Sequence, residues 1–317
     1  MKLIQKNVII RRSLHNLFCI PSQFIQELQE DLLSGIQTTS STSSKNSFSA
    51  ADTFLVKELL HPAITNLDME RIPPIFRNFI IHNVKKMSRL SVLKLCLSMT
   101  MSWSSFFSDI QTERFCRGIS CLRILIFQDF ADDTFLGHVG EHCSNLIKLD
   151  IQGSVNVSDV GLSKLGHLLK LRYIDVNRTE VSVAFLYAFL KNHPNVVSLG
   201  TWDDFSYFFE DQYLNFVEIR TSSLTQSQID IMSSLCHNLV ALELKITNNS
   251  YKLQKLCNLL SLTSLSVSGV NYRQSRLVVA MMALAPKLRH LSFDHINGMD
   301  TGDLRCIGQD CINLGRV

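Results

Sequence analysis

The amino-acid sequence predicts an α/β solenoid, in which a short strand and a helix recur along the chain. The first observation is the pattern Leu-x-x-Leu-x-apolar, which is clearest at residues 146–151. There Leu149 and Ile151 alternate with polar residues and so lie on one face of a short strand. The second observation is that this pattern returns at nearly constant intervals. The third is that apolar residues at helical spacing follow most of the strands, for example Leu162, Leu165 and Leu168.

The residue that opens the pattern recurs throughout the chain, at Ile64, Leu90, Leu122, Leu146, Leu171, Val196, Leu214, Leu239, Leu262, Leu288 and Leu314. Most steps between these positions fall within the roughly 20–29 residues of a leucine-rich repeat, which holds one strand and one helix or turn. We therefore predict a leucine-rich-repeat solenoid over residues 51–317, with about ten repeats and a partial last one. Its parallel strands should form the concave face of a curved horseshoe and its helices the convex face.

Two steps break the period. The longer one lies between Leu90 and Leu122 and predicts an enlarged convex segment at residues 99–107. The shorter one follows Val196 and holds several aromatic residues, including Trp202, with acidic residues between them. Such aromatic residues are typical of an interface anchor. The alternative is that they fill the core of an irregular repeat.

Cysteine recurs at one place in the repeat, three residues before the opening apolar residue, at Cys143, Cys236 and Cys311. This spacing predicts small, buried, reduced side chains. The nine cysteines are an odd number without close pairs, which favours an intracellular protein. We expect a cytoplasmic location, with the nucleus as a variant. A mitochondrial location is the alternative, because the first 26 residues contain basic residues and no acidic one.

Residues 1–35 predict an N-terminal helical segment, and the Ser/Thr-rich residues 36–50 predict a flexible linker. The segment can be explained as a short helix that caps the first repeat. The other interpretation is a docking box for an adaptor protein, formed by Leu14, Leu17, Cys19, Pro21, Phe24 and Leu28.

This docking pattern resembles the box by which substrate receptors bind elongin C and a cullin, and also the opening Leu-Pro-x-x-Leu of an F-box. The unit Cys143-x-x-Leu146-x-x-Leu149-x-Ile151 resembles the cysteine-containing repeats of F-box/LRR proteins. Residues 61–68 are similar to the Zyg-eleven/Zer group of cullin substrate receptors. The resemblance implies substrate recognition for a ubiquitin ligase, with an elongin or Skp-type adaptor and a cullin as partners.

Motifs for catalysis, cofactors or metals are absent from the sequence. It has no glycine-rich phosphate loop and no His-Glu-x-x-His, and its cysteine pairs lack zinc-ligand spacing. We expect the ten histidines not to cluster with carboxylates. We therefore predict no enzyme, no cofactor and no metal. The net charge of +3 is small and dispersed, which argues against nucleic acid, and no apolar run reaches the roughly 20 residues that span a membrane.

The concave face should carry the strand residues that lie between the buried ones. Aligned by the repeat, these include the acidic residues Asp150, Asp175, Glu218 and Glu243. Asp150 and Asp175 should lie on adjacent strands, as should Glu218 and Glu243, and adjacent strands are about 4.8 Å apart. Polar and aromatic residues flank them: Lys148, Gln152, Tyr173, Trp202 and Phe216. We predict that this strip binds a basic segment of a protein partner. The alternative is that acidic residues merely keep an exposed strand face soluble.

The function predicted from these features is non-enzymatic protein recognition, most specifically as the substrate-binding subunit of a cullin-type ubiquitin ligase. The alternative is a leucine-rich-repeat scaffold or assembly factor with no connection to ubiquitin.

Overall fold

The protein divides into two compact units in the computed structural model. The first comprises Met1–Leu149 and Ser154–Lys170, and the second Asp150–Gly153 and Leu171–Val317. The structure describes residues 60, 62–71, 74–95, 104, 107–202, 208, 215–221, 224–246, 253–269, 284, 287–295 and 301–314. The N-terminal segment with its docking residues, the linker and most of the predicted enlarged segment at 99–107 lie outside the described residues.

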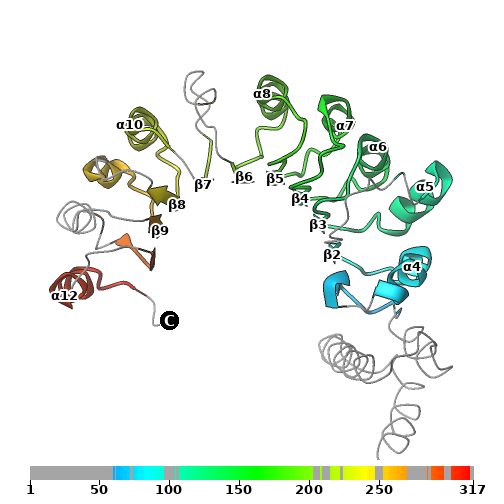
Figure 1. The fold of residues 1–317 in the computed structure, drawn as a ribbon, viewed down its shortest axis with the longest axis horizontal. Helices are drawn as coiled ribbons and strands as arrows, with labels where there is room; N and C mark the ends of the chain where they lie inside the picture. Colours follow the sequence, from blue (N-terminus) through cyan, green and yellow to red (C-terminus); the bar gives the residue numbers. More distant parts are fainter. Residues whose placement is uncertain are drawn as a thin grey trace, which may run out of the picture. The chain divides into compact units, whose positions relative to one another are not determined.

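The first unit alternates short parallel strands with helices, and its helices lie on one side of its strands (Figure 1). Its described elements are β1 Asn66–Asp68, the 3-10 helix η2 Met69–Arg71, α4 Pro74–Asn83, the 3-10 helix η3 Val84–Lys86, β2 Val92–Lys94, α5 Asp109–Gly118, β3 Ile124–Ile126, α6 Asp133–His142, β4 Lys148–Asp150 and α7 Asp159–Ser163. Strand β2 lies between β1 and β3 and is parallel to both.

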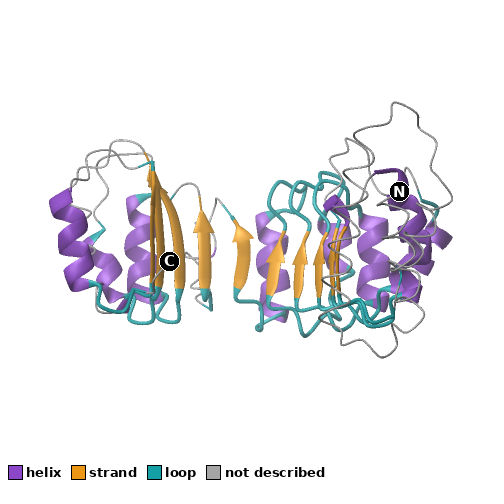
Figure 2. Ribbon diagram, turned by 90° about the horizontal axis from the view of Figure 1, so that it is seen from below, coloured by secondary structure: helices purple, strands orange, loops and turns teal. Residues whose placement is uncertain are grey.

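The second unit also alternates strands with helices, and its own strands are parallel to one another (Figure 2). Its described elements are β5 Tyr173–Asp175, α8 Val183–Asn192, β6 Ser198–Thr201, β7 Glu218–Thr221, α10 Gln226–Leu235, β8 Ala241–Ile246, the 3-10 helix η5 Gln254–Asn258, β9 Ser264–Gly269, β10 His290–Asp294 and α12 Thr301–Asp310. Each strand from β5 to β10 pairs in parallel with the next one along the chain.

The repeat pattern accounts for this order. In the repeat that opens at Leu171, the side chains of Leu171, Ile174 and Val176 are buried, as are Leu186 and Leu190 of the helix that follows. A strand only three residues long cannot bury a core alone, so each repeat depends on its neighbours. The predicted α/β leucine-rich-repeat fold is confirmed. The curvature of a complete horseshoe involves both units together and stays a prediction.

Side-chain caps fix where the helices begin. The residue before each of α5, α6, α7, α8 and α10 accepts a hydrogen bond from a backbone N–H of the first helical turn; these caps are Ser108, Asp132, Ser158, Ser182 and Thr225. Neighbouring helices are also linked to one another. The Asp133 carboxylate of α6 accepts hydrogen bonds from the Ser158 hydroxyl (2.6 Å) and the Gly161 N–H (3.0 Å) at the start of α7.

The recurring cysteines lie where the sequence places them. Cys143 and Cys236 follow the last residues of α6 and α10, and both are buried and unbridged. Burial raises the pKa of each thiol to about 12. These side chains are therefore neutral core residues, as predicted. Ser154 also turns inward as a repeat residue should, because its hydroxyl accepts a hydrogen bond from the Ala131 N–H (3.1 Å).

One repeat start predicted from the sequence is wrong. Phe216, and not Leu214, opens the repeat of β7, because Phe216 is buried and Glu218 pairs with Ala241 of β8. Strand β6 also contains a bulge. Its pairing with β7 slips between Ser198 and Thr201, around Gly200.

Among the described residues, no helix combines the length and apolar character needed to cross a membrane.

Candidate functional site on the strand face

The strand face of the second unit carries two columns of polar side chains. Strand pairing aligns the first column as Tyr173, Ser198, Glu218, Ala241, Ser264 and His290. It aligns the second column across β6 to β10 as Thr201, Arg220, Glu243, Ser266 and Ser292. Residues between the columns, such as Ile219, Leu242 and Leu265, are buried toward the helices. The site is therefore a strip across several parallel strands.

A buried carboxylate anchors one end of this strip. One oxygen of Asp175 accepts a hydrogen bond from the Asn177 N–H (3.0 Å), and the other accepts one from the Thr201 N–H (3.0 Å) and one from the Tyr173 hydroxyl (3.4 Å). Burial raises the pKa of the Asp175 carboxyl to about 6. The two N–H groups oppose the rise, whereas the nearby charge of Asp150 adds to it.

The same burial acts on the neighbouring phenol. It raises the pKa of Tyr173, and the negative charges of Asp175 and Asp150 raise it further. Tyr173 therefore keeps its proton and stays a hydrogen-bond donor to Asp175.

Gly200 makes this arrangement possible. Its φ of 65° belongs to the left-handed region that residues with a side chain rarely adopt. A Cβ atom at this position would overlap the Asp175 carboxylate, because it would stand closer to it than the Cβ atoms of real proteins stand to non-bonded atoms. The bulge of β6 therefore requires glycine, both for its backbone conformation and for the space that Asp175 fills.

A row of three charges follows on β7 and β8. The Arg220 guanidinium contacts the Glu218 carboxylate through Nε (2.7 Å) and a terminal nitrogen (2.6 Å). Its Nε also lies 3.9 Å from the Glu243 carboxylate. Burial lowers the pKa of Arg220, but the charges of Glu218 and Glu243 raise it more, so the net shift is upward. We call Glu218, Arg220 and Glu243 the charged ladder.

The charged ladder is the accessible part of the strip. The exposed fractions of the side chains are 24% for Glu218, 49% for Arg220 and 57% for Glu243. Ser198 steadies it from the neighbouring strand by donating a hydrogen bond to Glu218 (3.1 Å). The ladder thus presents negative, positive and negative groups in fixed positions, which suits polar recognition. It contains no nucleophile paired with a base.

The predicted acidic strip is correct in part. Asp150 and Asp175 lie near each other as expected, but both are buried, with only 7% and 2% of their surface exposed. Asp150 accepts a hydrogen bond from the Gln152 N–H (3.3 Å), a short-range contact that closes the turn after β4. The prediction that these two carboxylates face a partner is wrong, because both are enclosed by the protein.

The predicted aromatic flank is wrong for Trp202 and Phe216. Trp202 and Phe216 are both buried, and each packs edge-on against Phe208, with ring centroids 6.5 Å and 6.0 Å apart. The alternative interpretation, an irregular repeat with an aromatic core, is confirmed for these residues. Lys148 and Gln152 are half-buried on and after β4, and Tyr173 is half-buried on β5.

Arg220 was missed from the sequence. If the repeat starts at Leu214, Glu218 aligns with Glu243, and Arg220 lies outside both columns. The signal that could have placed it correctly is the pair Phe216 and Ile219, which matches the Leu239 and Leu242 of the next repeat.

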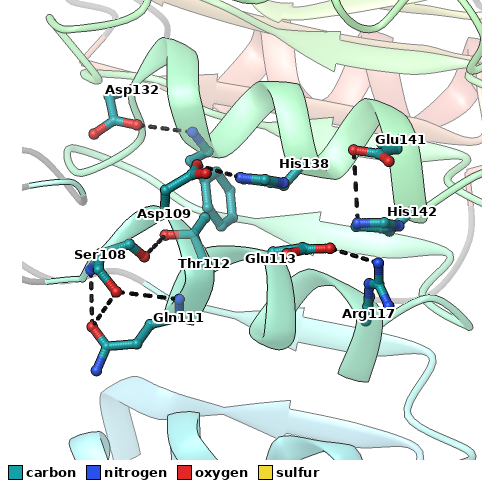
Figure 3. A network of polar contacts seen from close by, with 11 residues as sticks. Ser108, Asp109, Gln111, Thr112, Glu113, Arg117, Asp132, His138, Glu141 and His142 are labelled. Atoms are coloured by element: carbon teal, nitrogen blue, oxygen red, sulfur yellow. Dashed lines mark hydrogen bonds and ion pairs between the residues drawn. The ribbon is translucent and has the colours of Figure 1, made fainter.

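The expectation that histidines do not gather with carboxylates is also wrong. In the first unit, His138, Glu141 and His142 of α6 bring their ligand atoms within 4.8 Å of one another. Asp109 of α5 lies beside them (Figure 3). Two histidines four residues apart on one helix were the available signal.

No family model and no curated protein matches the chain. Among solved structures it is similar to an internalin of Listeria monocytogenes, at 16% identity over 88% of this chain and 79% of that one, with a TM-score of 0.40. It is similar to TLR13 in a complex with ssRNA13, at 14% identity and a TM-score of 0.45, over 82% of this chain and 39% of TLR13. It is also similar to an LRR protein of Leptospira interrogans, at 10% identity over 86% of each chain, with a TM-score of 0.33. The fold assignment rests on the repeat itself.

Proposed function

We propose that this protein is a non-enzymatic recognition module that binds a protein partner on the strand face of its second unit. The observation that carries the proposal is the charged ladder, in which Glu218 and Arg220 lie on the same face of β7 and Glu243 lies beside Arg220 on the paired strand β8. The strands hold the backbone, and Glu218 holds the guanidinium through two nitrogens. Side chains that are ordered in advance lose less conformational entropy when a partner binds.

The charge of the ladder defines the expected partner. Two carboxylates flank one guanidinium, so the row keeps an excess of negative charge. A partner segment with a basic residue opposite Glu243 and an acceptor opposite Arg220 would complement it. This proposal keeps a basic partner segment but moves its contacts from Asp150 and Asp175 to the ladder.

Replacing Glu218, Arg220 and Glu243 together with serine is expected to weaken partner binding at least about 10-fold, because complementary charges at interfaces contribute 1 kcal/mol or more. Folding should be retained, since exposed ion pairs add only about 0–1 kcal/mol. Proteins captured by the wild-type chain should be identified, and their affinity for both chains measured with purified components.

The matched control removes an ion pair of the same unit from its helix side. Asp230 of α10 pairs with Lys255 of η5 at 2.7 Å. Replacing both with serine should leave partner affinity unchanged. If the ladder variant binds as well as the control variant does, the strand face is not the binding surface.

Within this proposal, the finer role is that of substrate receptor for a cullin-type ubiquitin ligase in the cytoplasm. Its support is the sequence pattern of residues 13–35 and the resemblance of the cysteine-containing repeats to those of F-box/LRR proteins. In this role the N-terminal segment binds an elongin or Skp-type adaptor, and the ladder binds the substrate.

Deleting residues 1–35 is expected to abolish recovery of adaptor and cullin in affinity purification from cells. Replacing Leu14 and Leu17 with alanine should have the same effect, because apolar side chains carry such docking contacts. Replacing Lys2 and Lys6 with alanine is the control. Absence of elongin, Skp-type adaptors and cullins from the full-length sample would favour the scaffold or assembly factor, and cleavage of the N-terminus on import would favour its mitochondrial form.

A further inference from the structure

Helix α6 carries a group of metal-ligand residues outside the strand face. His138 and His142 are four residues apart, so both lie on one side of the helix. Their rings are nearly parallel, at 7°, with centroids 6.2 Å apart. Glu141 lies between them in the sequence, on the same turn of the helix as His142, and its Oε2 lies 3.8 Å from Nε2 of His142. The ligand atoms of the three residues lie within 4.8 Å of one another.

The hydrogen bond from His138 to Asp109 leaves its other ring nitrogen, Nδ1, available as a metal ligand. Its Nε2 lies 2.7 Å from Oδ1 of Asp109, which can only accept, so Nε2 carries the proton. In the neutral ring, Nδ1 then holds a lone pair. A histidine whose second nitrogen donates to a carboxylate is the usual arrangement of a metal-bound imidazole, because the carboxylate fixes the tautomer and raises the basicity of the ligand atom.

Two buried nitrogen atoms at this place lack any hydrogen-bond partner. They are Nδ1 of His138 and Nε2 of His142, and each is shielded from solvent. Only 15% and 14% of the two side chains are exposed. Buried polar atoms are normally hydrogen-bonded, because an unsatisfied one costs free energy. A cation bound by Nδ1 of His138 and Nε2 of His142 would satisfy both atoms.

The surrounding charges also favour a cation. Asp109 and Glu113 of α5 and Glu141 of α6 provide three carboxylates on this side of the two helices (Figure 3). Arg117 is the opposing positive charge, and it is paired with Glu113 at 2.5 Å. Negative charge is therefore in excess beside the two imidazoles.

We propose that His138, Glu141 and His142 form a binding site for a Zn²⁺ ion, with Asp109 as the hydrogen-bonded support of His138. Zinc accepts this set of two imidazole nitrogens and one carboxylate oxygen, with bonds of about 2.0–2.2 Å. Donors around a tetrahedral ion at that bond length lie about 3.4 Å apart. Small side-chain rotations of the three residues would bring the ligand atoms, now within 4.8 Å of one another, to that spacing. The exposure of Glu141 gives the ion a path from solvent. Zinc binding at α6 would be a second property of the protein, separate from partner binding on the strand face.

Titration calorimetry of the purified full-length chain with zinc chloride tests this site. The wild-type chain is expected to bind one Zn²⁺ ion, and its unfolding temperature should rise with zinc concentration. His138→Gln and His142→Gln should each weaken zinc binding at least about 10-fold, and Asp109→Asn about 10-fold. Glutamine at position 138 can still donate a hydrogen bond to Asp109, which helps the variant to fold.

The matched control is His167→Gln, because His167 is an exposed histidine of the same unit. It should bind zinc as the wild-type chain does. The proposal is overturned if the double variant His138→Gln/His142→Gln binds zinc as tightly as the wild-type chain, or if His167→Gln weakens binding equally.

A spectroscopic measurement on the wild-type chain keeps the test independent of variant folding. Co²⁺ bound to nitrogen and oxygen ligands should give visible d–d absorption that zinc abolishes. It should lack the intense charge-transfer band of thiolate ligands. No d–d band, or a dominant thiolate band from cysteines elsewhere in the chain, would overturn the assignment.

Discussion

Replacing Gly200 with alanine is expected to lower the free energy of unfolding of the second unit by roughly 2–6 kcal/mol. Two effects add. The left-handed backbone conformation of Gly200, with φ at 65°, costs about 1–3 kcal/mol for a residue with a side chain. The new Cβ would also overlap the Asp175 carboxylate, and relieving such overpacking costs about 1–3 kcal/mol more. Proteins have only about 5–15 kcal/mol of stability, so much of the variant is expected to be unfolded or aggregated.

Urea unfolding followed by circular dichroism measures this effect, and Gly308→Ala is the control. Gly308 lies in α12 of the same unit, with open space where a Cβ would stand. Alanine there should stabilise the helix by up to about 1 kcal/mol. Equal unfolding midpoints for the two variants would show that the bulge does not need glycine.

A double-mutant cycle separates the two effects at Gly200. Once Asp175 is alanine, the carboxylate that a Cβ at position 200 overlaps is gone. Adding Gly200→Ala should then cost the backbone strain, about 1–3 kcal/mol, together with the smaller overlap that remains with the Tyr173 hydroxyl. The difference from the cost in the wild-type chain measures the clash between the bulge and the buried carboxylate.

The repeat could be predicted from the sequence because the same pattern of apolar residues recurs in each repeat. Leu171, Ile174 and Val176 follow the predicted spacing, and all three are buried. Period and burial are linked physically, since a strand of alternating residues must put one set against the helices. The cysteines at the ends of α6 and α10 could also be predicted from the sequence, because they recur at one position of the repeat.

The candidate site could be predicted only in part, because the repeat of β7 was aligned on Leu214. The buried residues Phe216 and Ile219 match Leu239 and Leu242 of the next repeat, so Arg220, and not Glu218, pairs with Glu243. The bulge at Gly200 leaves no mark in the hydrophobic period, and it puts Thr201, and not Gly200, beside Arg220. The burial of Asp175 was equally hidden, because its N–H partners belong to residues whose side chains say nothing about it.

The buried Asp175 carboxyl is expected to make stability depend on pH in an unusual direction. Its pKa is about 6 in the folded protein, raised by burial from an ordinary 3.8. A raised folded-state pKa means that the protonated form is favoured by folding. The group therefore contributes stability that is fully present below about pH 4 and is lost as the pH rises through 6. A rise of about two units corresponds to roughly 3 kcal/mol.

The measurement compares the wild-type chain with Asp175→Asn, which cannot titrate. Carboxylates that do not interact with Asp175 change the stability of both chains alike, so the difference between their unfolding free energies reports Asp175 and its coupling to Asp150. This difference should move in favour of the wild-type chain by roughly 2–3 kcal/mol between pH 7 and pH 4. A flat difference would show that Asp175 is not held in a desolvated site.

Carbon-13 NMR of the Asp175 carboxyl gives the pKa directly and identifies its causes. The expected midpoint is about 6. Asp150→Asn should lower it, because the charge of Asp150 opposes ionisation of Asp175. Asp294→Asn, an exposed change on β10, should leave it in place. Tyr173→Phe should raise the midpoint, since the hydroxyl stabilises the ionised form. If these shifts occur, one carboxylate that the protein encloses, and not partner contact, explains why an acidic residue stands at this position of the repeat.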